Sequence, residues 1–311
     1  MQNIGNVRIP NQLVLAPMAD VCWLPFRLLC RRYGAGLVFN QMVNANALAR
    51  SNKATLKMIL TDPQEKPVAM QMFAAKIDNI KASALILEKK CDILDFNLGC
   101  PASSVVNIGA GSALLKRPAK IKEIIETLVD TVKIPVTAKI RSGISDNQAV
   151  KTARIIESAG ASAITIHART QQQGYSGKAK WSVIKEVKDS ISIPVIGNGD
   201  VFSPEDAKAM LDQTNCDFIM IGRAAMKDPS IFRRTDHYLS TGELLPEPEK
   251  TQKLEMLLEL YSIMKKYDFG IKAYREYAMW FTKGLDGSNK LRDRLSRIEE
   301  RDALIDVLKD F

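Results

Sequence analysis

Short, continuous runs of apolar residues recur through the first two thirds of the chain, with segments of helical periodicity between them. Eight such runs occupy residues 13–18, 37–43, 68–74, 93–98, 136–140, 163–167, 195–197 and 218–221. Runs that are continuously apolar, and do not alternate with polar residues, are typical of parallel strands covered by helices on both faces. The pattern therefore predicts eight parallel strands.

Helical periodicity fills most of the gaps between these strands. We predict helices over residues 25–33, 77–90, 119–132, 147–158, 181–189 and 204–211, with a weaker pattern between residues 50 and 66. Ser203 followed by Pro204 is a helix start, and Gly34 and Gly160 are placed to end their helices. Repeated alternation of strand and helix predicts an α/β fold, the (β/α)8 TIM barrel. An open, doubly wound sheet is less favoured because no G-x-G-x-x-G follows the first strand.

The pattern changes after residue 234. Residues 241–248 contain two prolines and are predicted to form a linker, whereas residues 249–311 carry only amphipathic helical periodicity. We therefore predict two domains, a barrel at residues 1–240 and a small C-terminal helical domain at residues 241–311.

Composition narrows the class of protein. The chain has 311 residues, of which 46% are hydrophobic and 25% charged, as is usual for a globular protein. Five cysteines without a C-x-x-C pair, and two distant histidines, argue against a metal site or a disulfide framework and favour a reducing cytoplasm. The sequence has no signal-peptide pattern and no apolar run of membrane-spanning length. We expect a cytoplasmic monomer without a membrane partner or a metal.

The net charge is +9. An excess of this size suggests a polyanionic partner such as nucleic acid, although a basic surface alone gives the same charge. Lys and Arg become denser after residue 250, with acidic residues interleaved. The helical domain is therefore the candidate surface for such a partner.

Candidate chemistry lies at the ends of the predicted strands, because TIM-barrel active sites form there. A lone Cys is more often a buried hydrophobic residue. Gly99 and Pro101, however, place Cys100 in a turn at a strand end, which favours a reactive thiol. The residues at the other strand ends are Ala16, Pro17, Met18, Gln71, Asn97, Lys139, Arg141, His167, Arg169, Asn198, Gly199, Asp200, Gly222 and Arg223.

Two of these loops suit a phosphate group. Residues 197–200 and 222–224 offer unhindered backbone N–H groups before helix starts, and Arg223 adds a positive charge. Lys139, in a buried strand, needs a partner, and the anionic edge of a reduced flavin supplies one. Gln71 and His167 are placed to share in binding the flavin ring.

Longer strings of the sequence resemble the tRNA-dihydrouridine synthase family over nearly the whole chain. The most specific are D-F-N-L-G-C-P-A from Asp95 and H-A-R-T-Q-Q-Q-G-Y-S-G from His167. The others are L-A-P-M-A-D from Leu15, M-Q-M-F-A from Met70, G-A-G-S-A-L-L from Gly109, K-I-R-S-G from Lys139, G-N-G-D from Gly197, I-G-R-A-A from Ile221 and W-F-T-K-G-L-D-G from Trp280. The resemblance implies an enzyme that reduces the C5–C6 bond of uridine in tRNA, with FMN as cofactor and NADPH, or NADH, as electron donor.

The resemblance also implies roles for individual residues. Cys100 would give a proton to C5 of uracil after hydride from the flavin enters at C6. FMN would be held by Ala16, Pro17, Met18, Gln71, Lys139, His167, Asn198, Gly199, Asp200, Gly222 and Arg223. The uracil or the RNA would contact Asn97, Arg141, Arg169, Tyr175, Lys272 and Arg275. The barrel would be the catalytic domain and the helical domain would bind tRNA.

Two alternatives stay open at this point. One is another FMN barrel, such as a dihydroorotate dehydrogenase, in which Cys100 is a base acting on a free pyrimidine; the basic helical domain argues against it. The other is a non-catalytic RNA-binding module, since a fold alone does not establish a function. The presence of Cys100 together with Lys139, His167 and Arg223 argues against that module.

Overall fold

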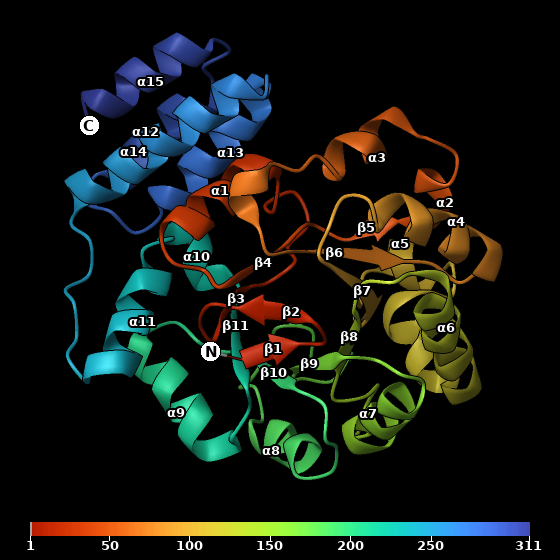
Figure 1. Ribbon diagram of the computed structural model, residues 1–311. Helices are drawn as coiled ribbons and strands as arrows, with labels where there is room; N and C mark the ends of the chain where they lie inside the picture. The colour runs from red at the N-terminus through yellow and green to blue at the C-terminus, as the bar shows by residue number, and fades with distance from the viewer. Residues whose placement is uncertain (1) are drawn as a thin grey trace.

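Eight parallel strands close into a barrel in the computed structural model, which describes residues 2–311 (Figure 1). The strands are β3 (Leu13–Leu15), β4 (Leu37–Phe39), β6 (Val68–Phe73), β7 (Ile93–Leu98), β8 (Val136–Arg141), β9 (Ala163–His167), β10 (Val195–Asn198) and β11 (Phe218–Ile221). Each pairs in parallel with the next, β11 pairs with β3, and β4 pairs with β6, so the ring has no open edge. The predicted (β/α)8 TIM barrel is confirmed.

The amino end of the barrel is covered by a hairpin that the sequence pattern did not predict. Strands β1 (Gln2–Ile4) and β2 (Val7–Ile9) pair antiparallel. Ile4 and Ile9 are fully buried and belong to the same core cluster as the inward-facing strand residues Phe39 and Phe218. The predicted strand at residues 37–43 is also shorter than expected, because it divides into β4 and the two-residue β5 (Val43–Asn44).

Helices surround the barrel and cover the outward-facing side chains of the strands (Figure 1). The long ones are α1 (Leu24–Arg32), α4 (Ile77–Leu87), α6 (Pro118–Thr131), α7 (Ala149–Ser158), α8 (Ser182–Lys188), α9 (Pro204–Thr214) and α11 (Ile231–Thr241). Shorter turns are α2 (Ala45–Leu48), α3 (Lys53–Met58), η1 (Pro63–Glu65), α5 (Ser103–Val106), η2 (Gly111–Lys116) and α10 (Arg223–Lys227). The predicted signals are present: Ser203 caps α9 through Asp206 N, and Gly34 and Gly160 have positive φ after α1 and α7.

Four further helices follow: α12 (Lys250–Lys266), α13 (Ile271–Phe281), α14 (Ser288–Ser296) and α15 (Arg301–Lys309). Helix α12 packs against α1, and α13 packs against α10 at the barrel rim. The hydroxyl of Tyr277 on α13 donates to the Val21 carbonyl at 2.5 Å, and its ring stacks on Phe26. This contact fixes α13 beside the loop that follows β3, close to the carboxyl end of the barrel.

The loop between α11 and α12 spans residues 242–249, at the position of the predicted linker. The division into domains at residue 240 stays a prediction. No helix within residues 2–311 has the length and apolar content to cross a membrane.

Candidate functional site

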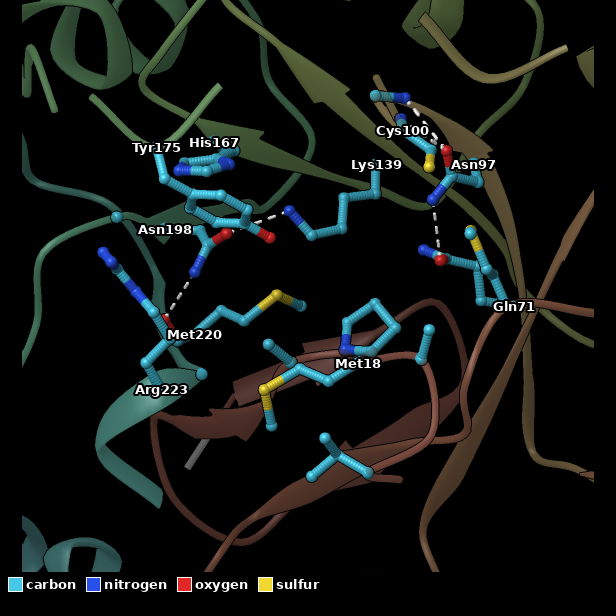
Figure 2. Close-up of a pocket in the computed structure, with 18 of the residues that line it drawn as sticks. Met18, Gln71, Asn97, Cys100, Lys139, His167, Tyr175, Asn198, Met220 and Arg223 are labelled. Carbon is cyan, nitrogen blue, oxygen red and sulfur yellow. Dashed lines mark hydrogen bonds between the residues drawn. The ribbon is translucent and has the colours of Figure 1, made fainter. Parts of the chain in front are cut away.

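A cavity of about 850 Å³ opens at the carboxyl ends of the strands (Figure 2). Most of the residues predicted for the site line it: Ala16, Pro17, Met18, Gln71, Asn97, Cys100, Lys139, Arg141, His167, Tyr175, Asn198, Gly199, Asp200, Gly222 and Arg223. Arg169, Lys272 and Arg275 do not line it. The parallel topology explains the gathering, because every strand of the closed ring delivers its last residues to the same end.

One side of the cavity, which we call the amide side, consists of Gln71, Asn97 and Cys100. The Gln71 Nε2 donates to the buried carboxylate of Asp95 at 2.7 Å, and Asn97 Nδ2 donates to Gln71 Oε1 at 2.8 Å. The Asn97 Oδ1 then accepts the backbone N–H groups of Gly99 at 3.1 Å and Cys100 at 2.9 Å. The loop that carries the thiol is therefore anchored to the end of β7.

A second anchor holds Cys100 from the other side. Its carbonyl accepts the Ser112 hydroxyl at 2.8 Å and the Ser112 backbone N–H at 3.0 Å. Burial raises the pKa of the Cys100 thiol above its ordinary value of 9.0, although Ala102 N and the Arg141 charge act in the opposite direction. Cys100 is half-buried at the cavity wall, whereas the other described cysteines are buried. It therefore presents a protonated thiol to the cavity at neutral pH.

The opposite side, which we call the cationic side, begins with Lys139 and His167. Figure 2 shows Lys139 extending away from Cys100 toward Asn198, and its Nζ donates to Asn198 Oδ1 at 2.9 Å. Burial, reinforced by the Arg141 charge, lowers the pKa of Lys139 to about 7. Burial and the charge of Lys139 lower the pKa of His167 to about 2, so His167 is neutral. Both side chains are therefore weaker bases in this site than they would be in water.

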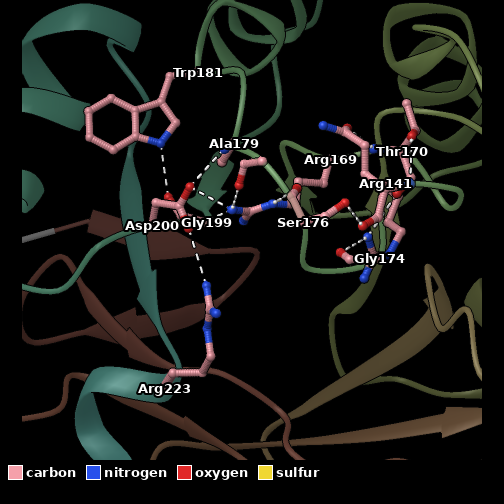
Figure 3. Close-up of polar contacts among 12 residues, drawn as sticks. Arg141, Arg169, Thr170, Gly174, Ser176, Ala179, Trp181, Gly199, Asp200 and Arg223 are labelled. Carbon is pink, nitrogen blue, oxygen red and sulfur yellow. Dashed lines mark hydrogen bonds and ion pairs between the residues drawn. The ribbon is translucent and has the colours of Figure 1, made fainter.

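An arginine and aspartate cluster extends the cationic side (Figure 3). The Arg169 Nη2 contacts both carboxylate oxygens of Asp200, at 2.8 and 2.7 Å. The Ala179 N–H donates to Asp200 at 2.7 Å, and Arg223 reaches the same carboxylate at 3.2 Å. The Asp200 carboxylate thus holds two guanidinium groups, and its backbone N–H is the part of this residue that suits a phosphate.

Arg169, for which an RNA contact is predicted, bonds within the loop that follows β9. It is 2% exposed, and its guanidinium also donates to the carbonyls of Ser176 and Gly177. These bonds tie the loop after β9 to the end of β10. The predicted RNA contact of Arg169 stays a prediction; in the structure its contacts hold the loop after β9 against Asp200.

Arg141 joins the two sides. Its Nε donates to the Gly99 carbonyl at 2.9 Å, and its Nη1 donates to the carbonyls of Thr170 and Gly174, both at 2.9 Å. The loop thus held carries Tyr175, which is 66% exposed at the cavity mouth and lies 6.3 Å from the His167 ring, centroid to centroid. An exposed ring in this place is suited to stack on a nucleobase.

Helix α13 contributes two cavity residues that the sequence reasoning missed, Glu276 and Trp280. Their i, i+4 spacing places them on one face of the helix, which is a signal that a sequence can carry. Lys272 and Arg275 lie on the same helix; the Lys272 side chain is 84% exposed, and Arg275 donates to the Ser296 carbonyl at 3.0 Å. The remaining missed residues with side chains at the cavity include Met42, Val201, Phe202, Met220 and Met226.

The sequence and the fold were compared with known proteins. The family model described as dihydrouridine synthase (Dus) matches residues 14–311. The chain is 39% identical to tRNA-dihydrouridine synthase B of Pseudomonas aeruginosa, over 99% of this chain and 95% of that protein. It is 36% identical to a probable tRNA-dihydrouridine synthase of Rickettsia bellii, over 100% of this chain and 98% of that protein.

Solved structures share the barrel fold at low sequence identity. A 2-naphthoyl-CoA reductase complex superimposes with a TM-score of 0.62 and 12% identity, over 76% of this chain and 51% of that chain. Histamine dehydrogenase from Rhizobium sp. 4-9 gives a TM-score of 0.57 and 13% identity, over 84% of this chain and 50% of that chain. At these identities the likeness establishes the fold alone.

Proposed function

The chain belongs to the dihydrouridine synthase family, and from this premise we propose that it reduces uridine in tRNA with FMN and NADPH, using Cys100 as the proton donor. It is accordingly an oxidoreductase of tRNA. The observation that carries the role of Cys100 is its position: a thiol kept protonated by burial, held at two backbone points, and facing the cavity.

The substrate follows from the relatives and the charge. Relatives that are 36–39% identical over nearly the whole chain carry tRNA in their names. A net charge of +9 suits a polyanion, whereas a free pyrimidine needs no such charge. We therefore place tRNA ahead of a free pyrimidine, and assign the barrel of residues 1–240 to catalysis and the helices of residues 241–311 to tRNA binding.

The cationic side of the cavity fits FMN. Among the described residues Lys139 Nζ has one hydrogen-bond acceptor, Asn198, so in its protonated form two N–H donors are available to the anionic edge of a flavin. The phosphate would be bound by the Arg223 guanidinium and by backbone N–H groups at the start of α10, where the Ala225 N–H already donates to the Gly222 carbonyl. The ring would lie against Ala16, Pro17, Met18, Gln71, Lys139 and His167, and the phosphate against Asn198, Gly199, Asp200, Gly222 and Arg223. Bound FMN supplies the hydride that enters the base at C6.

The residues of the amide side complete the reaction. The Cys100 thiol gives its proton to C5 of the base, where negative charge develops. Arg141 lowers the pKa of Cys100, so its guanidinium stabilises the thiolate that remains. Asn97 and Arg141 bind the polar edge of the base, and Tyr175 stacks at the mouth while the base is out of its helix. NADPH rather than NADH as donor, a cytoplasmic location and a monomeric state remain predictions.

The test is nucleoside mass spectrometry of tRNA that lacks dihydrouridine, after incubation with the purified protein, FMN and NADPH. We expect a gain of two hydrogens on uridine, and a matched reaction without NADPH should give none. Bound FMN without any product would favour a small-molecule reductase instead. Failure to bind FMN would overturn the cofactor assignment.

A further inference from the structure

Asp95 is a carboxylate inside the barrel, one layer below the cavity. It is 0% exposed and does not line the cavity. The Thr137 hydroxyl donates to Oδ1 at 2.6 Å and the Gln71 Nε2 donates to Oδ2 at 2.7 Å. Burial raises the pKa of Asp95 to about 6, so the group is mostly ionised at neutral pH and accepts both bonds. A buried carboxylate is costly, and the two hydrogen bonds together with the charge of Lys139 offset part of that cost.

In the series of hydrogen bonds from Asp95 to Cys100, the role of each group as donor or acceptor is fixed by the groups at the two ends. The ionised carboxylate only accepts, so Gln71 must turn its amide nitrogen toward Asp95 and its oxygen toward Asn97. At the other end, the backbone N–H groups of Gly99 and Cys100 only donate, so Asn97 must turn its oxygen toward them. Both ends impose the same order on the two amides between them.

This order decides what Asn97 presents to the cavity. Its carbonyl is committed to the loop of Cys100, and one N–H of its amide is committed to Gln71. The second N–H is therefore its remaining hydrogen-bonding group, and Asn97 lines the cavity. An N–H donor binds a carbonyl oxygen of a pyrimidine and opposes an exocyclic amino group.

We propose that Asp95 is a positioning residue: through Gln71 it holds Asn97 with its carbonyl on the Cys100 loop and its amide N–H toward the base. This arrangement favours the carbonyl edge of uracil over the amino edge of cytosine. The inference about the base rests on the proposed function, whereas the inference about the Cys100 loop does not.

Two variants separate the effect of the hydrogen bonds of Asp95 from the effect of its charge. Asp95→Asn keeps an oxygen for Gln71, and its new amide can donate to the Thr137 hydroxyl, which then accepts. The double variant Asp95→Leu with Thr137→Val replaces both groups by apolar side chains of similar size and leaves the Gln71 amide without its acceptor. Thermal unfolding of both variants checks that they fold.

The first measurement needs no catalysis. The rate of Cys100 alkylation by iodoacetamide, followed by peptide mass spectrometry, reports on the loop, because the other described cysteines are buried. We expect the Leu/Val variant to react about fivefold faster than wild type, and Asp95→Asn to stay within about twofold. Equal rates in all three proteins would overturn the positioning role.

The second measurement uses tRNA. We expect kcat/KM for uridine reduction to fall about tenfold or more in the Leu/Val variant and to be rescued in Asp95→Asn. Competition by tRNA with cytidine at the mapped position should strengthen relative to uridine tRNA in the Leu/Val variant. Equal losses in the two variants would assign the role to charge and overturn the proposal. A wild-type protein that makes no dihydrouridine refutes the proposed function, and the alkylation rates still decide the role of Asp95.

Discussion

The two sides of the cavity handle buried polar groups in opposite ways. On the amide side, the hydrogen bonds of Gln71 and Asn97 form a closed series from a carboxylate to backbone N–H groups. On the cationic side, Lys139 has one acceptor and Arg169 has a buried Nη1 without a partner within residues 2–311. On the first side the acceptors of Gln71 and Asn97 are all in use, whereas the second side has cationic donors without partners among the described residues. We infer that the amide side positions the proton donor and that the cationic side receives an anion.

The same physical cause produces different protonation on the two sides. Burial disfavours a charged form, so it raises the pKa of the Cys100 acid and lowers the pKa values of the bases Lys139 and His167. At neutral pH Cys100 consequently keeps its proton, His167 is neutral, and Lys139 is about half protonated. Cys100 therefore holds a proton at neutral pH, and its position on the amide side, away from the proposed flavin contacts of Lys139 and His167, makes it our candidate donor.

The largest effect should come from removing the thiol. Cys100→Ala is expected to reduce dihydrouridine formation by about 10²- to 10⁴-fold, the usual contribution of general acid catalysis. The flavin spectrum and NADPH oxidation should be retained, because Cys100 lies on the amide side. Cys216→Ala, at a buried cysteine outside the cavity, is the matched control. Full activity in Cys100→Ala would remove the thiol from the mechanism.

A smaller effect is expected on the cationic side. Arg223→Ala should weaken FMN binding about tenfold or more, because one charge-assisted contact to the phosphate is lost. Quenching of FMN fluorescence measures the affinity. Arg233→Ala removes the same charge from an exposed residue that lies over the Tyr33 ring, and should leave the affinity unchanged. If both variants bind FMN as wild type does, the phosphate lies elsewhere.

The pH profile tests which side supplies the proton. Because burial raises the pKa of Cys100 above its ordinary value of 9.0, the protonated donor is lost only as the pH rises through that raised pKa. We expect kcat for dihydrouridine formation to fall by about tenfold per pH unit beyond the thiol pKa. In Cys100→Ser the residual activity should lack this decline, since the hydroxyl does not titrate there. A decline centred near pH 7 in the wild type would point to Lys139 instead.

Much of the barrel could be predicted because each strand is marked by a continuous apolar run within a short stretch of sequence. The apolar runs at residues 93–98, 163–167 and 218–221 coincide with β7, β9 and β11. The hairpin β1–β2 was missed because strands of three residues carry too little pattern, and its place under the barrel depends on Ile4 and Ile9 meeting residues far along the chain.

The candidate site, too, could be predicted only in part from the sequence. Residues at strand ends could be predicted to gather because the topology brings all strand ends together. The direction of each side chain could not be predicted: nothing in the sequence indicated that Arg169 is buried and pairs with Asp200. Glu276 and Trp280 were missed because their place depends on how α13 docks, through contacts such as that of Tyr277 with Val21.

The smallest effect concerns the outer rim, where α13 extends the cationic side toward solvent. The Lys272 side chain is 84% exposed and its nearest carboxylate, Glu276, is 3.8 Å away, so its charge is available to an RNA phosphate. Lys272→Ala should weaken tRNA binding about two- to fivefold and reduce the slope of log K against log salt by about one. Lys185→Ala, which removes an exposed lysine on α8 whose side chain is 47% exposed, should change neither quantity if tRNA approaches over α13. Binding curves at several salt concentrations separate the outcomes: equal slopes for Lys272→Ala and wild type would place the RNA on another face of the protein, even if Cys100 and Arg223 act as described.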